Sequence, residues 1–230
     1  MISLYLTTGM NGSIWSGRPS IDDDEPQLYR EYHSNNNEIF YSIAHNADLT
    51  AEDVTTFEAI AAGNKGTLLL SDRQGTLAGT WDVLHTASGP LNCIAYGNGT
   101  FVAVGPNNLV IRSEDSGATW TEFKGAIPGA TWSWIVAANE PTGLRFVAVG
   151  NTSIVDPADP MMQNHIITGA LMYSDDGGAT WSKGSVNANA PLNSIAYSPE
   201  LNVYVAVGNK HLNSANKEIA TLVSVDGTKP

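Results

Sequence analysis

Two similar octets combine side chains that could do chemistry: "SEDSGATW" beginning at Ser113 and "SDDGGATW" beginning at Ser174. Each combines a hydroxyl, a carboxylate two residues later, a glycine and a second hydroxyl. An aspartate in a tight turn accepts hydrogen bonds from nearby backbone N–H groups, and glycine supplies the positive φ that such a turn needs. The octets are therefore either a repeated site or a repeated turn. Because a turn would use up their polar groups locally, we predict that they are structural.

The other candidate groups are an acidic run, the histidines and one cysteine. The run from Asp22 to Glu25 could attract calcium, but it lacks the alternating ligand spacing and the glycine of a calcium loop, so a solvated loop is favoured. The 5 histidines include no pair at ligand spacing. The chain has a single cysteine, Cys93, which lies in an apolar segment with no basic side chain placed in the sequence to activate its thiol. We expect neither a metal site nor a cofactor.

The elements that position the octets come from an internal repeat. Related segments such as "PLNCIAYGNGTFVAVG" and "PLNSIAYSPELNVYVAVG" are centred on isoleucines, namely Ile43, Ile94, Ile135 and Ile195. In each unit one run rich in β-branched residues ends in a glycine and the next run reaches a serine. The best-kept unit predicts four strands, over 91–96, 100–105, 108–114 and 119–123. Four-stranded units with a period of about 40–60 residues predict an all-β fold, the β-propeller.

At the octets the sequence resembles the Asp-box, or BNR-type, repeat proteins, whose motif is S-x-D-x-G-x-T-W. Both octets match it at every specified position, while "SDRQGTLAGTW" from Ser71 and "SVDGTKP" from Ser224 are degenerate copies. The resemblance implies that each octet is a structural turn between the third and fourth strands of a blade. The residues concerned are Ser113, Asp115, Gly117, Thr119, Trp120, Ser174, Asp176, Gly178, Thr180 and Trp181.

The repeat predicts one domain over residues 1–230, built of about five units. Residues 1–37 form a partial unit with an acidic loop, 38–89, 90–130 and 131–190 form full units, and 191–230 form an incomplete last unit. Incomplete terminal units leave unpaired strand edges, which are a hazard in a soluble protein. We therefore expect a partner or the acidic segment to cover them.

Two enlarged connections are the clearest departures from the repeat. One lies between Gly150 and Ser174 and the other between Gly208 and Ser224, which is the same connection of adjacent units. Loops on a rigid scaffold often carry recognition, so we predict that both emerge on one face and contact a partner. The candidate contact residues are Asp156, Asp159, Met161, Met162, Asn164, His165, His211 and Asn213.

The family resemblance raises one enzymatic alternative, a sialidase-like glycoside hydrolase. Such enzymes are expected to hold a substrate carboxylate with three arginines and to use a Tyr–Glu nucleophile pair with an acidic partner. The arginines of this chain are Arg18, Arg30, Arg73, Arg112 and Arg145, and their contexts do not suggest convergence. Arg112 and Arg145 are expected at solvated positions. We therefore predict that the chain is not an enzyme and assign no catalytic residue.

The net charge and the distribution of apolar residues disfavour some classes of function. A net charge of −12 disfavours nucleic acid, and no apolar run approaches the length of a membrane span or forms a signal peptide. The preferred hypothesis is a structural or binding propeller whose partners are other subunits of a larger assembly, with a surface glycan as a second class of ligand. The resemblance to short Asp-box proteins implies a phage tail, baseplate or fibre component located in the virion. An assembly factor for another large complex is the second alternative.

Overall fold

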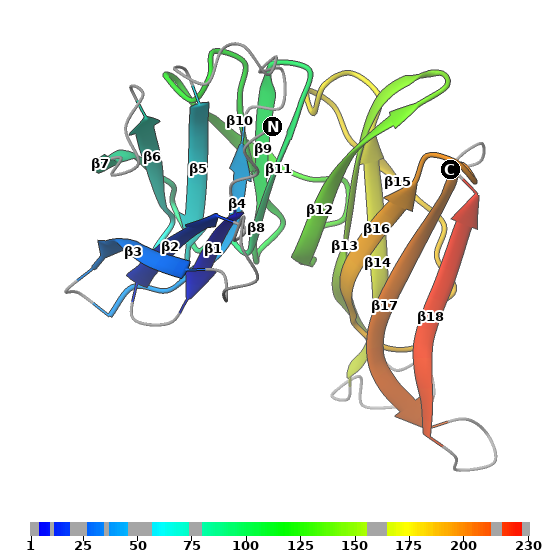
Figure 1. The fold of residues 1–230 in the computed structure, drawn as a ribbon. Helices are drawn as coiled ribbons and strands as arrows, with labels where there is room; N and C mark the ends of the chain where they lie inside the picture. Colours follow the sequence, from blue (N-terminus) through cyan, green and yellow to red (C-terminus); the bar gives the residue numbers. More distant parts are fainter. Residues whose placement is uncertain are drawn as a thin grey trace. The chain divides into compact units, whose positions relative to one another are not determined.

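The computed structural model describes residues 5–9, 12–18, 27–34, 37–45, 57–73, 80–155, 165–212 and 218–226. Within these ranges the regular structure is β-strand, and the strands form sheets in which neighbours follow one another in chain order (Figure 1). No helix in the described part of the chain has the length and apolar character needed to cross a membrane.

The sheets divide the chain into successive segments. The first sheet holds β1 (Tyr5–Gly9), β2 (Ser13–Arg18) and β3 (Gln27–His33). The second holds β4 (Phe40–His45), β5 (Phe57–Gly63), β6 (Thr67–Arg73) and β7 (Thr80–Thr86). The third holds β8 (Cys93–Gly97), β9 (Thr100–Val104), β10 (Leu109–Ser113) and β11 (Thr121–Lys124). The fourth holds β12 (Thr131–Glu140), β13 (Gly143–Val155), β14 (His165–Ser174) and β15 (Ser182–Lys183). The fifth holds β16 (Leu192–Ser198), β17 (Val203–Leu212) and β18 (Glu218–Asp226).

The predicted all-β class with incomplete terminal units is confirmed. Counting the strands of the described residues, the first and last sheets are 3-stranded, whereas the three between them are 4-stranded. Ser113 ends β10 and Ser174 ends β14, so each octet follows the third strand of its sheet. One strand was not predicted: β3 lies in the segment that the sequence assigned to the acidic loop, while the acidic residues 22–25 fall outside the described residues.

The chain divides into two compact units, and the first comprises Met1–Ala103 with Ser113–Thr121. Its buried core joins apolar residues of the first and second sheets, namely Ile14, Phe40, Ala59, Ala61, Leu69 and Trp81. The first strands β4 and β8 are tied together because the Ile94 N–H donates to Ser42 Oγ at 3.2 Å. Cys93 is buried beside this contact, with its sulfur 3.5 Å from Ser42 Oγ. Cys93 is thus a core residue.

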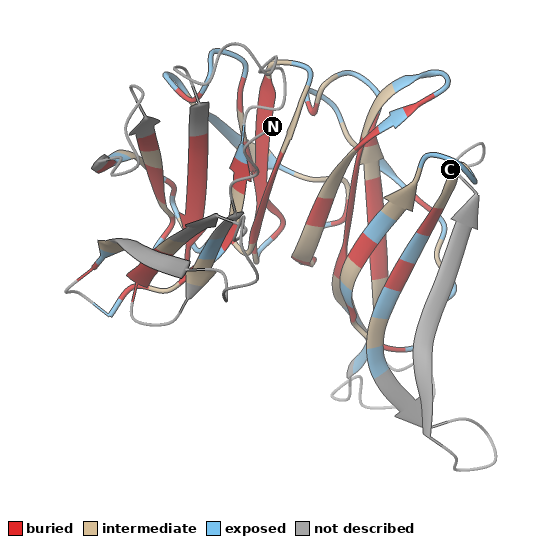
Figure 2. Ribbon diagram, viewed as in Figure 1, coloured by how far each residue is buried: buried red, intermediate tan, exposed pale blue. Residues whose placement is uncertain are grey.

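The second unit comprises Val104–Arg112 with Glu122–Pro230. Its core packs the fourth sheet against the fifth: Val147, Val149 and Leu171 meet Leu192 and Ile195 in one buried cluster. Burial runs along nearly all of the central residues of β13 but alternates along β17 (Figure 2). One face of β17 is therefore covered and the other is open.

The glycine that follows the apolar run of the second strand has a steric cause in three of the sheets. Gly63, Gly150 and Gly208 each pair with the first strand where that strand is bulged. The bulge pushes a carbonyl toward the glycine: a Cβ on Gly63 would lie 2.8 Å from the Ile39 oxygen, and one on Gly150 would overlap the Thr131 oxygen. Only glycine leaves room for this approach of two backbones.

Candidate binding surface

The first octet is a turn held by its own side chains. Ser113 Oγ donates to Asp115 Oδ1 at 2.8 Å and accepts from the Gly117 N–H at 2.8 Å. Asp115 also accepts from the backbone N–H of Thr119 at 2.8 Å and from its hydroxyl at 2.6 Å. Trp120 Nε1 donates to the Gly117 carbonyl at 2.8 Å. The polar groups of the octet therefore bond to one another.

The second octet repeats these bonds nearly atom for atom. Asp176 accepts from Ser174 Oγ at 2.7 Å and from the Thr180 N–H at 2.9 Å, and Trp181 Nε1 donates to the Gly178 carbonyl at 3.1 Å. Burial acts to raise the pKa of Asp176, but the hydrogen bonds from Thr180 and Ser174 outweigh it and bring the pKa to about 2. Hydrogen bonds from Thr119, then Ser113, bring the pKa of Asp115 to about 2. Both turns bind the charged form of the aspartate.

Each octet also contacts the sheet that precedes it in the chain. In the first unit, a Cβ on Gly117 would lie 2.8 Å from Leu84 Cδ2 and 2.9 Å from Ile60 Cδ1, so this glycine packs directly on the second sheet. In the second unit, Arg112 of β10 donates from Nε to the Gly177 carbonyl at 2.7 Å. The expectation that Arg112 is simply solvated is wrong, because its guanidinium holds the following octet.

Replacing Asp176 with alanine should destabilise the protein by about 1–2 kcal/mol through the loss of turn hydrogen bonds. The carboxylate is exposed, so water limits the loss. Chemical denaturation of Asp176→Ala measures it, and Asp82→Ala, another exposed aspartate, should stay within about 0.5 kcal/mol of the parent.

The same carboxylate gives a pH dependence with a defined sign. Because folding lowers the pKa of Asp176 to about 2 from about 3.9 in an unfolded chain, its stabilisation is complete above about pH 4 and is lost as the pH falls toward 2. The difference between the parent and Asp176→Ala should shrink over that window. A difference that is unchanged at pH 2, or absent at pH 7, would contradict the turn-fastening role.

The degenerate copy at Ser71 lacks these bonds among the described residues. Ser71 Oγ and Trp81 Nε1 are buried without a hydrogen-bond partner, and Gly75, the residue that would correspond to Gly117, lies outside the described residues. The degenerate copy at Ser224 lies in β18, and nothing is described of its side chain.

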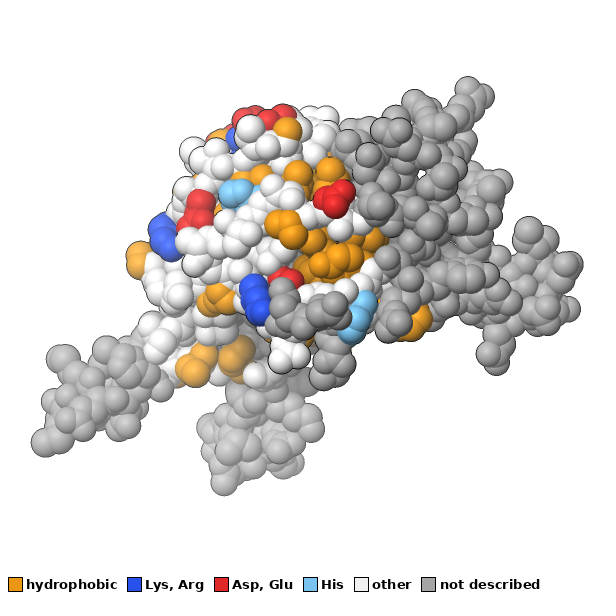
Figure 3. All heavy atoms as spheres, turned by 90° about the vertical axis from the view of Figure 1, so that its left-hand side faces the viewer, with side chains coloured by type: hydrophobic (Ala, Val, Ile, Leu, Met, Phe, Trp, Pro, Cys, Tyr) orange, Lys and Arg blue, Asp and Glu red, His pale blue; other side chains and the backbone are white. Residues whose placement is uncertain are grey.

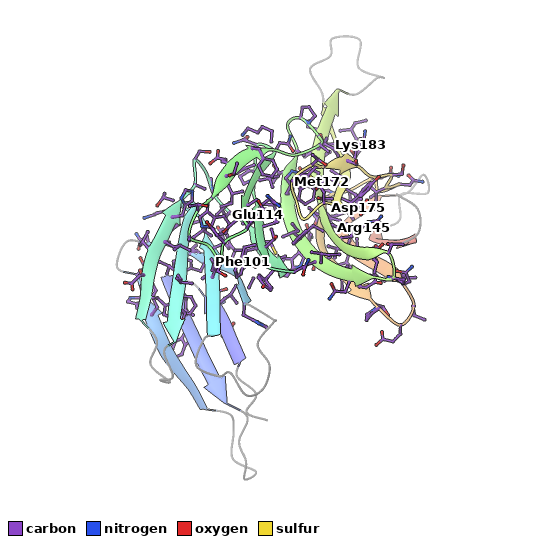
Figure 4. All side chains as sticks on the ribbon, turned by 90° about the horizontal axis from the view of Figure 1, so that it is seen from above. Phe101, Glu114, Arg145, Met172, Asp175 and Lys183 are labelled. Carbon is purple, nitrogen blue, oxygen red and sulfur yellow. The ribbon has the colours of Figure 1, made fainter. Side chains whose placement is uncertain are left out.

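A buried polar network joins the fourth and fifth sheets. Tyr204 of β17 donates its hydroxyl to Glu140 Oε1 at 2.6 Å, and Arg145 reaches the same oxygen at 3.3 Å. Arg145 also pairs with Asp175 at 2.5 Å, next to which it lies in Figure 4, and its guanidinium stands 5.1 Å from the centre of the Tyr173 ring. Arg145 is thus a bridging residue and not the solvated residue expected from the sequence.

The Tyr204–Glu140 pair has the residue types of a sialidase nucleophile but not the required environment. A nucleophile must reach its substrate and is activated by a lowered pKa or a base. Tyr204 is buried, and burial, followed by the hydrogen bond to Glu140, raises the pKa of its hydroxyl well above the usual value. The contact therefore acts as a hydrogen bond between two sheets.

The two enlarged connections are extensions of the strands as well as loops. Beyond Gly150, β13 continues to Val155 and stays paired with β14, ending at the pair Val155↔His165. Beyond Gly208, β17 continues to Leu212, which pairs with Glu218 of β18. We call these two hairpin extensions the arms: residues 151–169 and 209–220. Both arms extend toward the lower side of Figure 1.

The first arm carries apolar side chains that face solvent. Ile166 is 39% and Ile167 51% exposed. Because successive strand residues point to opposite faces, both sides of the arm present an isoleucine. His165 and His211 lie in the arm strands, and nothing is described of their side chains. The other predicted contact residues lie outside the described residues, namely Asp156, Asp159, Met161, Met162, Asn164 and Asn213.

Among the described residues no group of three or more His, Cys, Asp or Glu side chains could hold a metal ion.

On the face drawn in Figure 3, hydrophobic side chains gather near the centre, with isolated acidic, basic and histidine side chains around them. The described exposed surface of the first unit includes Tyr41 and Val83.

Comparison with known proteins identifies the fold of the chain but not a protein family. No protein-family profile and no curated protein matches the chain. A chain of the structure titled "Crystal structure of Nidogen/Laminin Complex" is similar with a TM-score of 0.60 at 9% identity, over 99% of this chain and 75% of that one. The structure titled "YCF48 bound to D1 peptide" gives a TM-score of 0.53 at 16% identity, over 96% of this chain and 63% of that one. The fold is a β-propeller.

In this propeller the sheets are blades, and the arms and the octets lie at opposite ends of the blades. In the fourth blade the first arm includes the start of β14 at His165, and the octet begins at the end of β14, at Ser174. The sequence repeat located both features but missed Glu140 and Tyr204. One signal could have found them: Arg145 stands where the equivalent strands have Thr100 and Val203, and a charged residue in that apolar strand needs a partner.

Proposed function

We propose that the protein is a non-enzymatic, Asp-box-type binding propeller that works as a subunit of a larger assembly and holds a protein partner through its two arms. The arms carry the proposal, because the first exposes isoleucines on both faces of a two-stranded ribbon. Such apolar exposure is costly in an isolated protein and typical of an interaction site. The octets support the assignment to the Asp-box type, since their serine, aspartate and threonine side chains bond within the turn.

The similar structures support a protein partner as the ligand class. One comes from a nidogen/laminin complex, and the other is YCF48 bound to a D1 peptide. Within this class we propose a phage tail, baseplate or fibre component, on the Asp-box resemblance. A surface glycan is the second ligand class, and an assembly factor for another complex is the second setting.

Shortening both arms tests this proposal. Residues 152–168 and 211–219 are each replaced by Asn-Gly, because Asn151 pairs with Gly169 and Lys210 with Ala220 and a two-residue turn closes an antiparallel pair. The shortened protein should melt within a few degrees of the parent but lose its stoichiometric partner on purification from the source. The matched control is Asp176→Ala, which should weaken the fold and keep the partner. Retention of the partner by the shortened protein would refute the proposal.

A further inference from the structure

One six-residue segment occurs in three successive blades with different surroundings. It reads "TFVAVG" at Thr100, "RFVAVG" at Arg145 and "VYVAVG" at Val203. Its two valines are fully buried in β9, where Val102 and Val104 are both 0% exposed. In β13, Val147 and Val149 are 3% and 0% exposed, but in β17, Val205 and Val207 are 41% and 46% exposed. The same side chains at the same strand positions thus lack a cover only in the fifth blade.

The fourth blade identifies what covers these valines. Val147 and Val149 share a buried cluster with Leu192 and Ile195 of β16, the first strand of the next blade. The leucine and the isoleucine lie three residues apart across a bulge, so both reach the preceding blade. In the fourth blade, the cover of the valine face is therefore a first strand with the pattern Leu-x-x-Ile.

The open face of the fifth blade is suited to the same cover. By register, Ala196 lies beside Val205, Ser194 beside Val207 and Ser198 beside Val203. These six residues carry no charge, and Ala196 is exposed like the valines. In addition, β14 of the fourth blade is paired with β15, whereas no described strand pairs with the outer edge of β18. The open face of β17 thus corresponds to the face of β13 that packs against β16 between the fourth and fifth blades.

We infer that this open face, formed by β16 and β17 around Val205 and Val207, is a docking surface for the first strand of a further propeller blade supplied by a protein partner. In a second copy of this chain, the first strands β4, β8 and β16 already pack on an element of the preceding sheet. The partner is defined by its chemistry: a bulged strand that presents a leucine and an isoleucine three residues apart, on an uncharged surface. This surface is distinct from the arms, so it stands independently of the proposed function.

The test measures access to position 205 in Val205→Cys, whose other thiol, Cys93, is buried. The probe is the same variant carrying one extra repeat: residues 1–223 followed by a copy of residues 174–226, since Ser224 occupies the position of Ser174. The introduced thiol should react quickly with a thiol reagent in the unextended protein, which should sediment as a monomer, and at least tenfold more slowly in the extended protein. The matched control changes the copied leucine and isoleucine to aspartate and should restore fast labelling.

Labelling in the source material completes the test. In the native assembly, the introduced thiol of the unextended variant should be protected at least tenfold relative to the isolated protein. Equal labelling with and without the extra repeat would show that the face does not accept a first strand. Protection in an isolated dimer would identify a second copy as the occupant, and fast labelling in the native assembly would show an uncovered face. Each of these three outcomes would overturn the inference.

Discussion

Replacing Gly150 with alanine is expected to destabilise the protein by about 3 kcal/mol. The added Cβ would overlap the carbonyl oxygen of Thr131 and lie 2.9 Å from the Cα of Trp132. Both obstacles are backbone, so the bulge in β12 must shift, and with it the fully buried Trp132, whose indole N–H bonds to Asn108 Oδ1 at 2.9 Å. Urea unfolding of Gly150→Ala against the parent measures the loss.

Gly99→Ala is the matched control for this prediction. Gly99 has a φ of +82° and nothing within 4 Å of an added Cβ, so it should lose only the backbone strain of about 1 kcal/mol. Losses of equal size at the two glycines would show that conformational freedom, and not the close approach of β12, explains the glycine that closes each second strand.

Replacing Glu140 with alanine should cost about 2–4 kcal/mol, because it leaves the buried Tyr204 hydroxyl without its acceptor. Arg145 would keep Asp175 as its partner, since that contact does not involve Glu140. Glu200→Ala, at an exposed glutamate on the β16–β17 turn, should change stability by no more than about 0.5 kcal/mol.

A double-mutant cycle separates the hydrogen bond from other effects of the substitution. In Tyr204→Phe the hydroxyl is removed together with its need for an acceptor, so adding Glu140→Ala should cost less than in the parent. Costs that add without coupling would mean that the hydrogen bond between the fourth and fifth blades contributes nothing to stability.

The strand order and the octets could be predicted because each depends on residues close together in the chain. Three of the second strands are recognised by the sequence Phe-Val-Ala-Val-Gly or a near copy of it. The hydrogen bonds of Asp115 extend only as far as Thr119, four residues along the chain. The polar network could not be predicted in the same way, because Tyr204 meets Glu140 from another blade. Contacts of that range require the packed sheets to be known.

Two segments were misjudged for local reasons. In β3, "QLYREYH" places Arg30 and Glu31 between tyrosines, and these charges hide a strand that pairs with β2 with one register shift at Glu31. In the arms, the sequence predicts strand ends at Gly150 and Gly208, but each glycine marks the close approach of the first strand while its own strand continues. The predicted long loop in the fourth blade is therefore in large part a two-stranded ribbon.

The central claim is that the arms, and not the octets, meet the partner. Site-specific photo-crosslinking within the native assembly tests it most directly, with the crosslinking residue placed at Ile167 on the first arm or at Ala179 in the second octet. Both positions are exposed: Ile167 lies near the start of β14, and Ala179 lies beyond the end of the same strand. The account predicts one adduct of defined mass from position 167 and none from position 179. An adduct from position 179 alone, or from neither position, would contradict it.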